Sequence, residues 1–112
     1  MGRLLARKRQ FDAALKFYMR TVRIDSTQVE ALIGAGNLLT MGGRSGESLL
    51  LFERALKLHP DNALARFYYG LALLKSERRG AAHTALLEAL AVARDPTLQE
   101  QIQKAIGSTT AR

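Results

Sequence analysis

Apolar residues recur along most of the chain at intervals of three and four, the spacing that places them on one face of an α-helix. Two segments show this clearly, one with Leu64, Phe67, Tyr68, Leu71 and Leu74 and the other with Leu98, Ile102 and Ile106. The chain is rich in helix-favouring residues and has only two prolines,. The pattern predicts helices over residues 2–8, 11–24, 28–41, 46–58, 62–75, 79–93 and 97–106.

Residues that end or begin helices separate these segments. Gly42-Gly43 and Gly80 lie where one helix ends and the next begins, and His59–Asn62 contains a proline followed by capping residues,. Thr27–Glu30 and Thr97–Glu100 have the spacing of capping boxes and predict two further helix starts,. The chain therefore consists of short helices joined by tight turns.

The chain also resembles itself at a spacing of 34 residues. Seven sets of three residues at this spacing keep a similar size and polarity. The sets are Gly2/Gly36/Gly70, Leu5/Leu39/Leu73, Ala14/Ser48/Ala82, Tyr18/Phe52/Leu86, Thr21/Ala55/Ala89, Val22/Leu56/Leu90 and Ile24/Leu58/Val92. A fixed period of this length is typical of a solenoid built from stacked helix pairs.

These residues resemble the tetratricopeptide-repeat (TPR) family. The best copy spans Val29–Asn62 and matches the family pattern at Leu32, Ala35, Gly36, Leu39, Ser48, Phe52, Ala55 and Pro60. Leu32 stands where the family usually has Trp, and Ser48 where it has Ala. The resemblance implies an all-α, right-handed α-solenoid of antiparallel helix pairs. The run Ala65–Leu74 also resembles TPR proteins of bacterial c-type cytochrome maturation.

We expect a single domain over residues 1–106 with a flexible tail at 107–112. Its predicted parts are a truncated first repeat (1–28), two full repeats (29–62 and 63–95) and a capping helix (96–106). The first copy lacks about half of its first helix, which leaves Leu4, Leu5 and Phe11 with fewer neighbours. This predicts a homo-oligomer, or a place in a longer array or larger complex, through the N-terminal edge.

Charge adds a second hypothesis about function. The chain has 17 Lys and Arg against 10 Asp and Glu. Much of the excess lies in the first 25 residues, where a basic patch comprises Arg3, Arg7, Lys8, Arg9, Arg20 and Arg23. Such a patch could bind nucleic acid or another anionic surface, although no RNA-binding motif accompanies it. No signal peptide or transmembrane segment is predicted, which favours a cytoplasmic location.

The sequence offers little for catalysis or for cofactors. It has no Cys, and neither His59 nor His83 has a carboxylate or second His beside it at helical spacing,. Gly42–Gly46 lacks the Gly-Lys-Ser/Thr ending of a phosphate-binding loop,. We therefore expect no catalytic residue, no metal and no cofactor.

The resemblance places a concave groove along the first helix of each repeat, and it implies a protein or peptide partner there. The groove residues implied in this way are Arg7, Ile33, Asn37, Leu64, Phe67, Leu71 and Leu74. A carboxylate clamp of the chaperone-binding type is disfavoured because Ile33, Phe67 and Leu71 stand where polar groups are needed. The alternative is that the apolar stripe is buried within the chain, either by the terminal helix or by the curvature of the solenoid.

Overall fold

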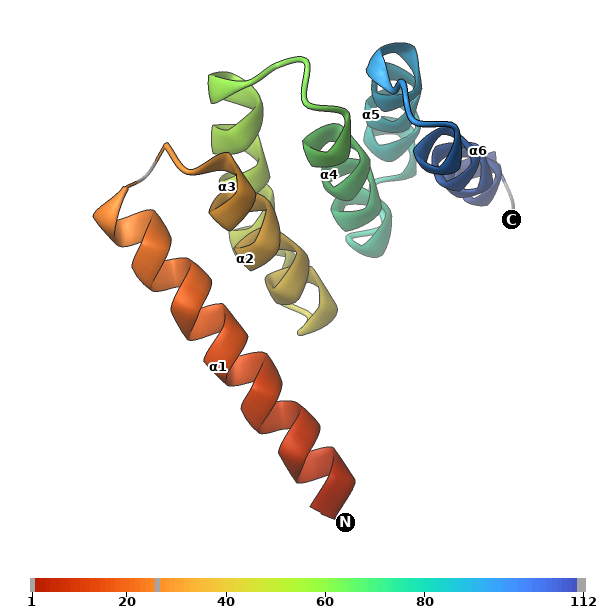
Figure 1. Cartoon of the computed structure of the whole chain (residues 1–112). Coiled ribbons are helices and arrows are strands. Elements are labelled where there is room, and N and C mark those ends of the chain that lie inside the picture. The colour runs from red at the N-terminus through yellow and green to blue at the C-terminus, as the bar shows by residue number, and fades with distance from the viewer. Residues whose placement is uncertain (1, 26, 111–112) are drawn as a thin grey trace.

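The computed structural model describes the backbone of residues 2–25 and 27–110 and the side chains of residues 6–25 and 27–110. All regular structure in these residues is α-helical (Figure 1). The helices are α1 Gly2–Ile24, α2 Val29–Met41, α3 Ser45–Leu58, α4 Ala63–Lys75, α5 Arg79–Val92 and α6 Pro96–Thr110. The predicted all-α solenoid class is confirmed.

The pairs α2–α3 and α4–α5 are two copies of one unit. Figure 1 shows α2, α4 and α6 following one another through the molecule, with α3 and α5 behind them. Glycine lets the two helices of each pair approach closely. A Cβ atom on Gly36 would lie 2.8 Å from Phe52 Cζ, and one on Gly70 would lie 2.7 Å from Leu86 Cδ2. The repeated glycines therefore admit the large side chains of the paired helix.

The repeated small and bulky positions form the core. Their members in the two complete repeats are fully buried, namely Ser48, Phe52, Ala55, Ala82, Leu86 and Ala89. Ser48 fits this position despite its hydroxyl group because Ser48 Oγ donates to Ser45 O at 2.8 Å and lies 2.9 Å from Thr40 Oγ1. The buried polar group is thus hydrogen-bonded, as burial requires.

The turns between helices repeat as well. Arg44 N donates to Leu39 O and Arg78 N donates to Leu73 O. Each bond spans a residue in the left-handed conformation just after the first helix of its repeat, Gly43 or Glu77. This is the pattern of a Schellman cap. Asn62 caps α4, since its Oδ1 accepts from Ala65 N at 3.0 Å.

Two predicted capping boxes are wrong. Thr27 does not cap α2, because its hydroxyl donates to Asp25 Oδ1 and α2 starts after Gln28 without a side-chain cap. Helix α6 starts at Pro96, one residue before the predicted Thr97. Asp95 Oδ1 accepts from Thr97 N at 3.2 Å, and proline suits the first helical position because it has no amide proton to leave unbonded,.

The first helix differs most from expectation. Residues 2–24 form one continuous helix, so the predicted break between residues 8 and 11 is wrong. Lys8, Arg9 and Gln10 all favour a helix, and neither glycine nor proline interrupts them,. Tyr18 of this helix packs on the next repeat, where a Cβ on Gly34 would lie 2.7 Å from Tyr18 Cζ.

Helix α6 covers the C-terminal end of the solenoid. Ile102 is fully buried and Ala105 nearly so, in a cluster with Phe67, Leu86, Ala89 and Ala93. The helix continues to Thr110, so residues 107–110 of the predicted flexible tail are helical. Residues 111–112 lie outside the described part of the chain. The division into repeats at residues 28, 62 and 95 stays a prediction.

Candidate functional site: the hollow between α2 and α4

The first helices of the two complete repeats, α2 and α4, border a surface hollow of about 240 Å³. We call it the α2–α4 hollow, and its lining residues are Glu30, Ile33, Gly34, Asn37, Leu64 and Tyr68. The four residues from α2 recur at helical spacing, which places them on one face. The repeat therefore sets equivalent faces of α2 and α4 side by side.

The α2–α4 hollow combines an apolar floor with a few polar groups. Ile33 is nearly buried, while Leu64 keeps 42% of its surface exposed beside it. Tyr68 is half-buried and leans on Phe67, with the ring centroids 5.3 Å apart. Glu30 and Asn37 add a carboxylate and an amide from α2. An accessible apolar surface with few polar groups suits a ligand that presents apolar side chains and one or two hydrogen-bonding groups.

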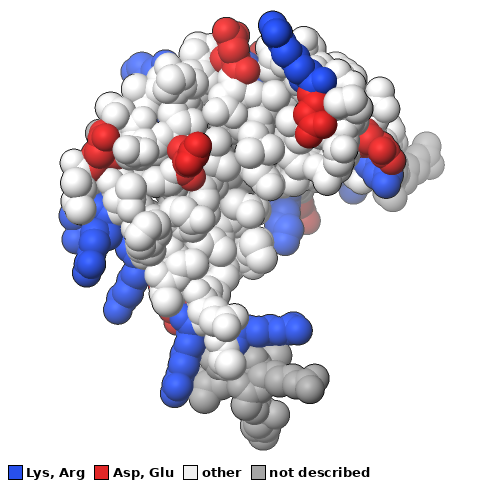
Figure 2. All heavy atoms as spheres, viewed as in Figure 1, with Lys and Arg blue, Asp and Glu red and all other residues white. Residues whose placement is uncertain are grey.

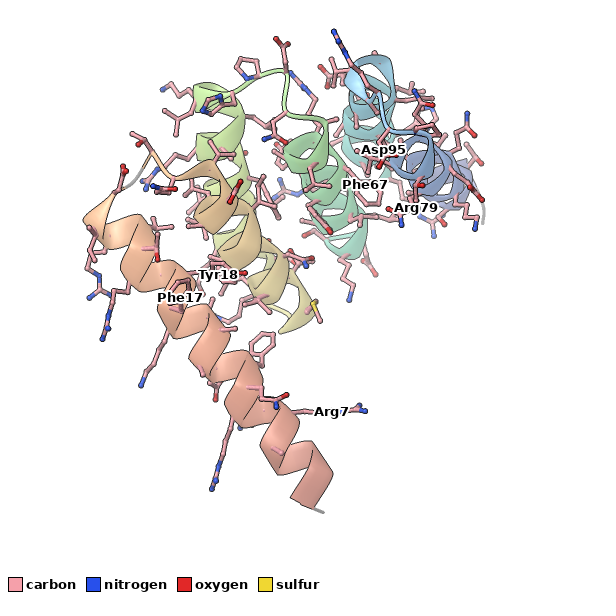
Figure 3. The ribbon with its side chains drawn as sticks, in the orientation of Figure 1. Arg7, Phe17, Tyr18, Phe67, Arg79 and Asp95 are labelled. Carbon is pink, nitrogen blue, oxygen red and sulfur yellow. The ribbon has the colours of Figure 1, made fainter. Side chains whose placement is uncertain are left out.

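The hollow brings together only some of the predicted groove residues. Ile33, Asn37 and Leu64 lie in it. Leu74 packs against the core cluster that contains Leu32 and Phe52. Arg7 lines a separate hollow with Phe11 and Met41, on the part of α1 that projects beyond the other helices (Figure 3).

Phe67 and Leu71 face the terminal helix instead. Phe67 is only 8% exposed and belongs to the cluster around Ile102, and Leu71 packs on the same cluster. Figure 3 shows Phe67 on the side of α4 that faces α6. Phe67 and Leu71 are therefore buried within the chain, as the alternative interpretation expected, because apolar residues of α6 pack in the same cluster.

The groove residues predicted from the sequence do not include Gly34 and Tyr68. Tyr68 was visible as a member of the α4 apolar stripe, and it lies 34 residues after Gly34. The repeat spacing therefore places both residues at equivalent positions on the first helices of their repeats. Choosing between Phe67 and Tyr68, however, needs the position of α6, which no local pattern gives.

The predicted basic patch divides between sides of α1. Arg7, Lys8, Arg9, Arg20 and Arg23 are all exposed, and Arg3 lies outside the residues whose side chains are described. Helical spacing places Arg9, Arg20 and Arg23 on one side, together with Lys16. Arg7 and Lys8 instead line the hollow beside Phe11 and Met41. The five predicted residues whose side chains are described therefore do not form one continuous surface.

The residues that the structure describes contain no group of three or more His, Asp or Glu placed to hold a metal ion. His59 is exposed, and His83 Nδ1 lies 2.7 Å from Thr109 Oγ1, which joins α5 to α6.

No helix in the described part of the chain is long and apolar enough to cross a membrane.

Comparison with known sequences gives partial matches to much longer proteins. No protein-family model matches the chain. It is 36% identical over 76 residues to a Petunia hybrida protein named "Probable UDP-N-acetylglucosamine--peptide N-acetylglucosaminyltransferase SPINDLY", a match that covers 68% of this chain and 8% of that protein. Superkiller protein 3 of Saccharomyces cerevisiae is 24% identical over 66 residues, 59% of this chain and 5% of that protein. The chain thus spans less than a tenth of these relatives.

Solved structures match over nearly the whole chain. The structure of PcrH in complex with the chaperone-binding region of PopD has a TM-score of 0.82 and 16% identity, covering 97% of this chain and 85% of that one. The Yersinia enterocolitica type III secretion translocator chaperone SycD also has a TM-score of 0.82, with 14% identity, 93% of this chain and 74% of that one. YrrB, described as a TPR protein with an unusual peptide-binding site, has a TM-score of 0.76 and 26% identity, covering 92% and 53%.

Proposed function

We infer that this chain, a tetratricopeptide-repeat protein, is a non-catalytic interaction module that binds a peptide or helix of another protein in the α2–α4 hollow. The single observation that carries the proposal is the hollow itself. It lies between the first helices of two repeats, and Leu64 in its wall stays 42% exposed although most other residues of α4 are buried or half-buried.

The chemistry of the hollow indicates what kind of segment fits. Ile33, Leu64 and Tyr68 can contact an apolar side chain of the ligand, while Asn37 can donate to and accept from a peptide group,. Glu30 adds a negative charge at one end, which favours a basic or amide-bearing neighbour in the ligand,. The ligand class is therefore a short segment with an apolar anchor and little negative charge.

The structural neighbours support this class of function. PcrH is described in complex with a segment of another protein, and YrrB with a peptide-binding site. Both statements concern those proteins, and the hollow gives a physical reason to extend the same kind of function to this chain. SPINDLY is named as a transferase, but the match spans only 8% of it, so that activity is not carried over to this chain.

Binding of selected peptides tests the proposal. Peptides are selected from a random display library on the full chain, and their affinities are then measured for Leu64→Arg and for Leu50→Arg. Leu50 is 66% exposed on α3, outside the hollow, and serves as the matched control. We expect Leu64→Arg to weaken binding by about thirtyfold or more, as for loss of an apolar anchor, and Leu50→Arg to change it little.

The second hypothesis, binding of an anionic polymer through α1, gives a different result. Peptides selected through the hollow should keep most of their affinity at high salt. Binding dominated by phosphate groups falls steeply with salt concentration. If Leu64→Arg and Leu50→Arg bind equally well, the proposed peptide site in the hollow is wrong.

A further inference from the structure

A second surface lies on α1, away from the α2–α4 hollow. Phe17 is 66% exposed and Ile24 is 80% exposed, and Ala13 is exposed as well. Positions 13, 17 and 24 fall on one face of a helix. We call this face the α1 ridge. It points away from α2, because the neighbouring Tyr18 packs on Gly34 of that helix.

The repeat shows what the position of Phe17 does elsewhere in the chain. Its counterparts 34 and 68 residues later are Leu51 and Ala85. Ala85 is only 4% exposed and belongs to the core cluster that joins the two complete repeats, and Leu51 is half-buried against the same cluster. Phe17 therefore occupies a position that packs against neighbouring helices wherever the described chain provides them. On α1, no helix of the described chain covers this position, and Phe17 stays 66% exposed.

Charge limits what can cover the ridge. Helical spacing places Arg9, Lys16, Arg20 and Arg23 along one side of it, and Asp12 is the only acid in α1. Figure 2 shows Lys and Arg side chains gathered over α1 at the left of the molecule. Among the described residues, the ion pairs Arg44–Glu47, Arg66–Glu88 and Glu100–Lys104 all lie outside α1. Like charges would oppose pairing with α1 of a second copy, whereas an acidic partner would be attracted.

We propose that the α1 ridge docks an acidic amphipathic helix of another protein. The apolar face of that helix would cover Phe17 and Ile24, and its acidic flank would lie beside Arg20 and Arg23. Such a helix would take the place along α1 that a paired helix takes along α3 and α5. The residues from Ala6 to Ile24 span about 27 Å, so the partner helix would have about 20 residues.

Fluorescence anisotropy with a designed probe tests this inference. The probe is a labelled helical peptide of about 20 residues, with Leu and Ala on one face and Glu on both flanks, and the matched probe carries Lys in place of Glu. Phe17→Ala is compared with Leu50→Ala, because both side chains are 66% exposed. We expect the Glu peptide to bind, Phe17→Ala to weaken it about tenfold or more and Leu50→Ala to weaken it less than about twofold. The Lys peptide should not bind.

Further measurements test the contribution of charge and check that the variants fold. Arg20→Glu together with Arg23→Glu should lower the affinity for the Glu peptide at least as much as Phe17→Ala does. Circular dichroism should show an unchanged melting midpoint for Phe17→Ala, since the ring is mostly exposed. If that variant unfolds, Ile24→Ala replaces it, with the same expected loss of binding.

Several results would overturn the inference. Equal affinity for the Glu and Lys peptides, or no effect of Phe17→Ala, would remove the ridge as the binding surface. A dimer in sedimentation that Phe17→Ala abolishes would make a second copy the occupant. Binding of poly(U) RNA or of phosphatidylserine vesicles without binding of the Glu peptide would make the ridge a site for an anionic polymer or membrane. The tests of the α2–α4 hollow use other residues, so either proposal can fail alone.

Discussion

At the scale of single residues, the two complete repeats differ at the end of their first helix. Gly43 and Glu77 occupy the same turn position, with φ of 81° and 62°. Glycine adopts this left-handed conformation without steric cost, whereas a residue with a Cβ atom pays about 1–2 kcal/mol. The third repeat thus keeps the geometry of the turn with a less suitable residue.

Glu77→Gly should therefore stabilise the protein. We expect an increase of about 0.5–1 kcal/mol in the free energy of unfolding, measured by urea denaturation. Glu77→Ala is the matched control, because it removes the charge and keeps the Cβ atom, and it should have little effect. A stabilisation of equal size in both variants would mean that the charge, and not the backbone conformation, is responsible.

Tyr69 predicts a dependence on alkaline pH. Partial burial of the phenol, with the nearby Glu53 carboxylate, raises the pKa of Tyr69 above its usual value of 10.0. Its hydroxyl donates to Glu53 Oε2 at 3.2 Å. A raised pKa means that the folded state holds the proton more tightly, so this contribution to stability is complete below pH 10 and is lost as the pH rises further. Urea titrations above pH 10 should show a steeper loss of stability for the wild type than for Tyr69→Phe, and equal slopes would contradict this.

At the scale of elements, α6 owes its position to a few apolar contacts. Phe67 packs with Ile102 and Ala105 and is 8% exposed. Phe67→Ala should therefore destabilise the protein by about 3–5 kcal/mol, as large core truncations do. Calorimetry would measure this, with Phe17→Ala as the control that removes a mostly exposed ring. A loss below about 1 kcal/mol for Phe67→Ala would mean that α6 does not cover this side chain in solution.

Some helices could be placed from sequence and others could not, for physical reasons. Periodicity, the Gly42-Gly43 turn and Asn62 located α2 to α5, because the capping chemistry of Gly43 and Asn62 is local. The 34-residue repeat predicted a turn between residues 8 and 11. The turn is absent, because Lys8, Arg9 and Gln10 favour a continuous helix,. The buried state of Phe67 depends on where α6 lies, and a local pattern does not contain that information.

At the scale of the whole molecule, two chemically different surfaces lie on different helices. The α2–α4 hollow is mostly apolar with one acid, Glu30, whereas α1 carries seven basic residues and one acid. The affinity of a ligand that binds the hollow through apolar contacts should not depend on salt. The affinity of a ligand held by the charges of α1 should fall as salt is added. The same binding experiment at two salt concentrations therefore separates the two surfaces.

We propose that the α2–α4 hollow holds the peptide partner, and amide chemical-shift mapping can locate the bound peptide residue by residue. The ¹⁵N-labelled full chain is titrated with a peptide selected from the display library at high salt. We expect the largest shifts at Ile33, Gly34, Asn37 and Tyr68, with α5 and the N-terminal half of α1 nearly unchanged. Shifts confined to α1 around Arg7 and Lys8, and reduced by added salt, would contradict it.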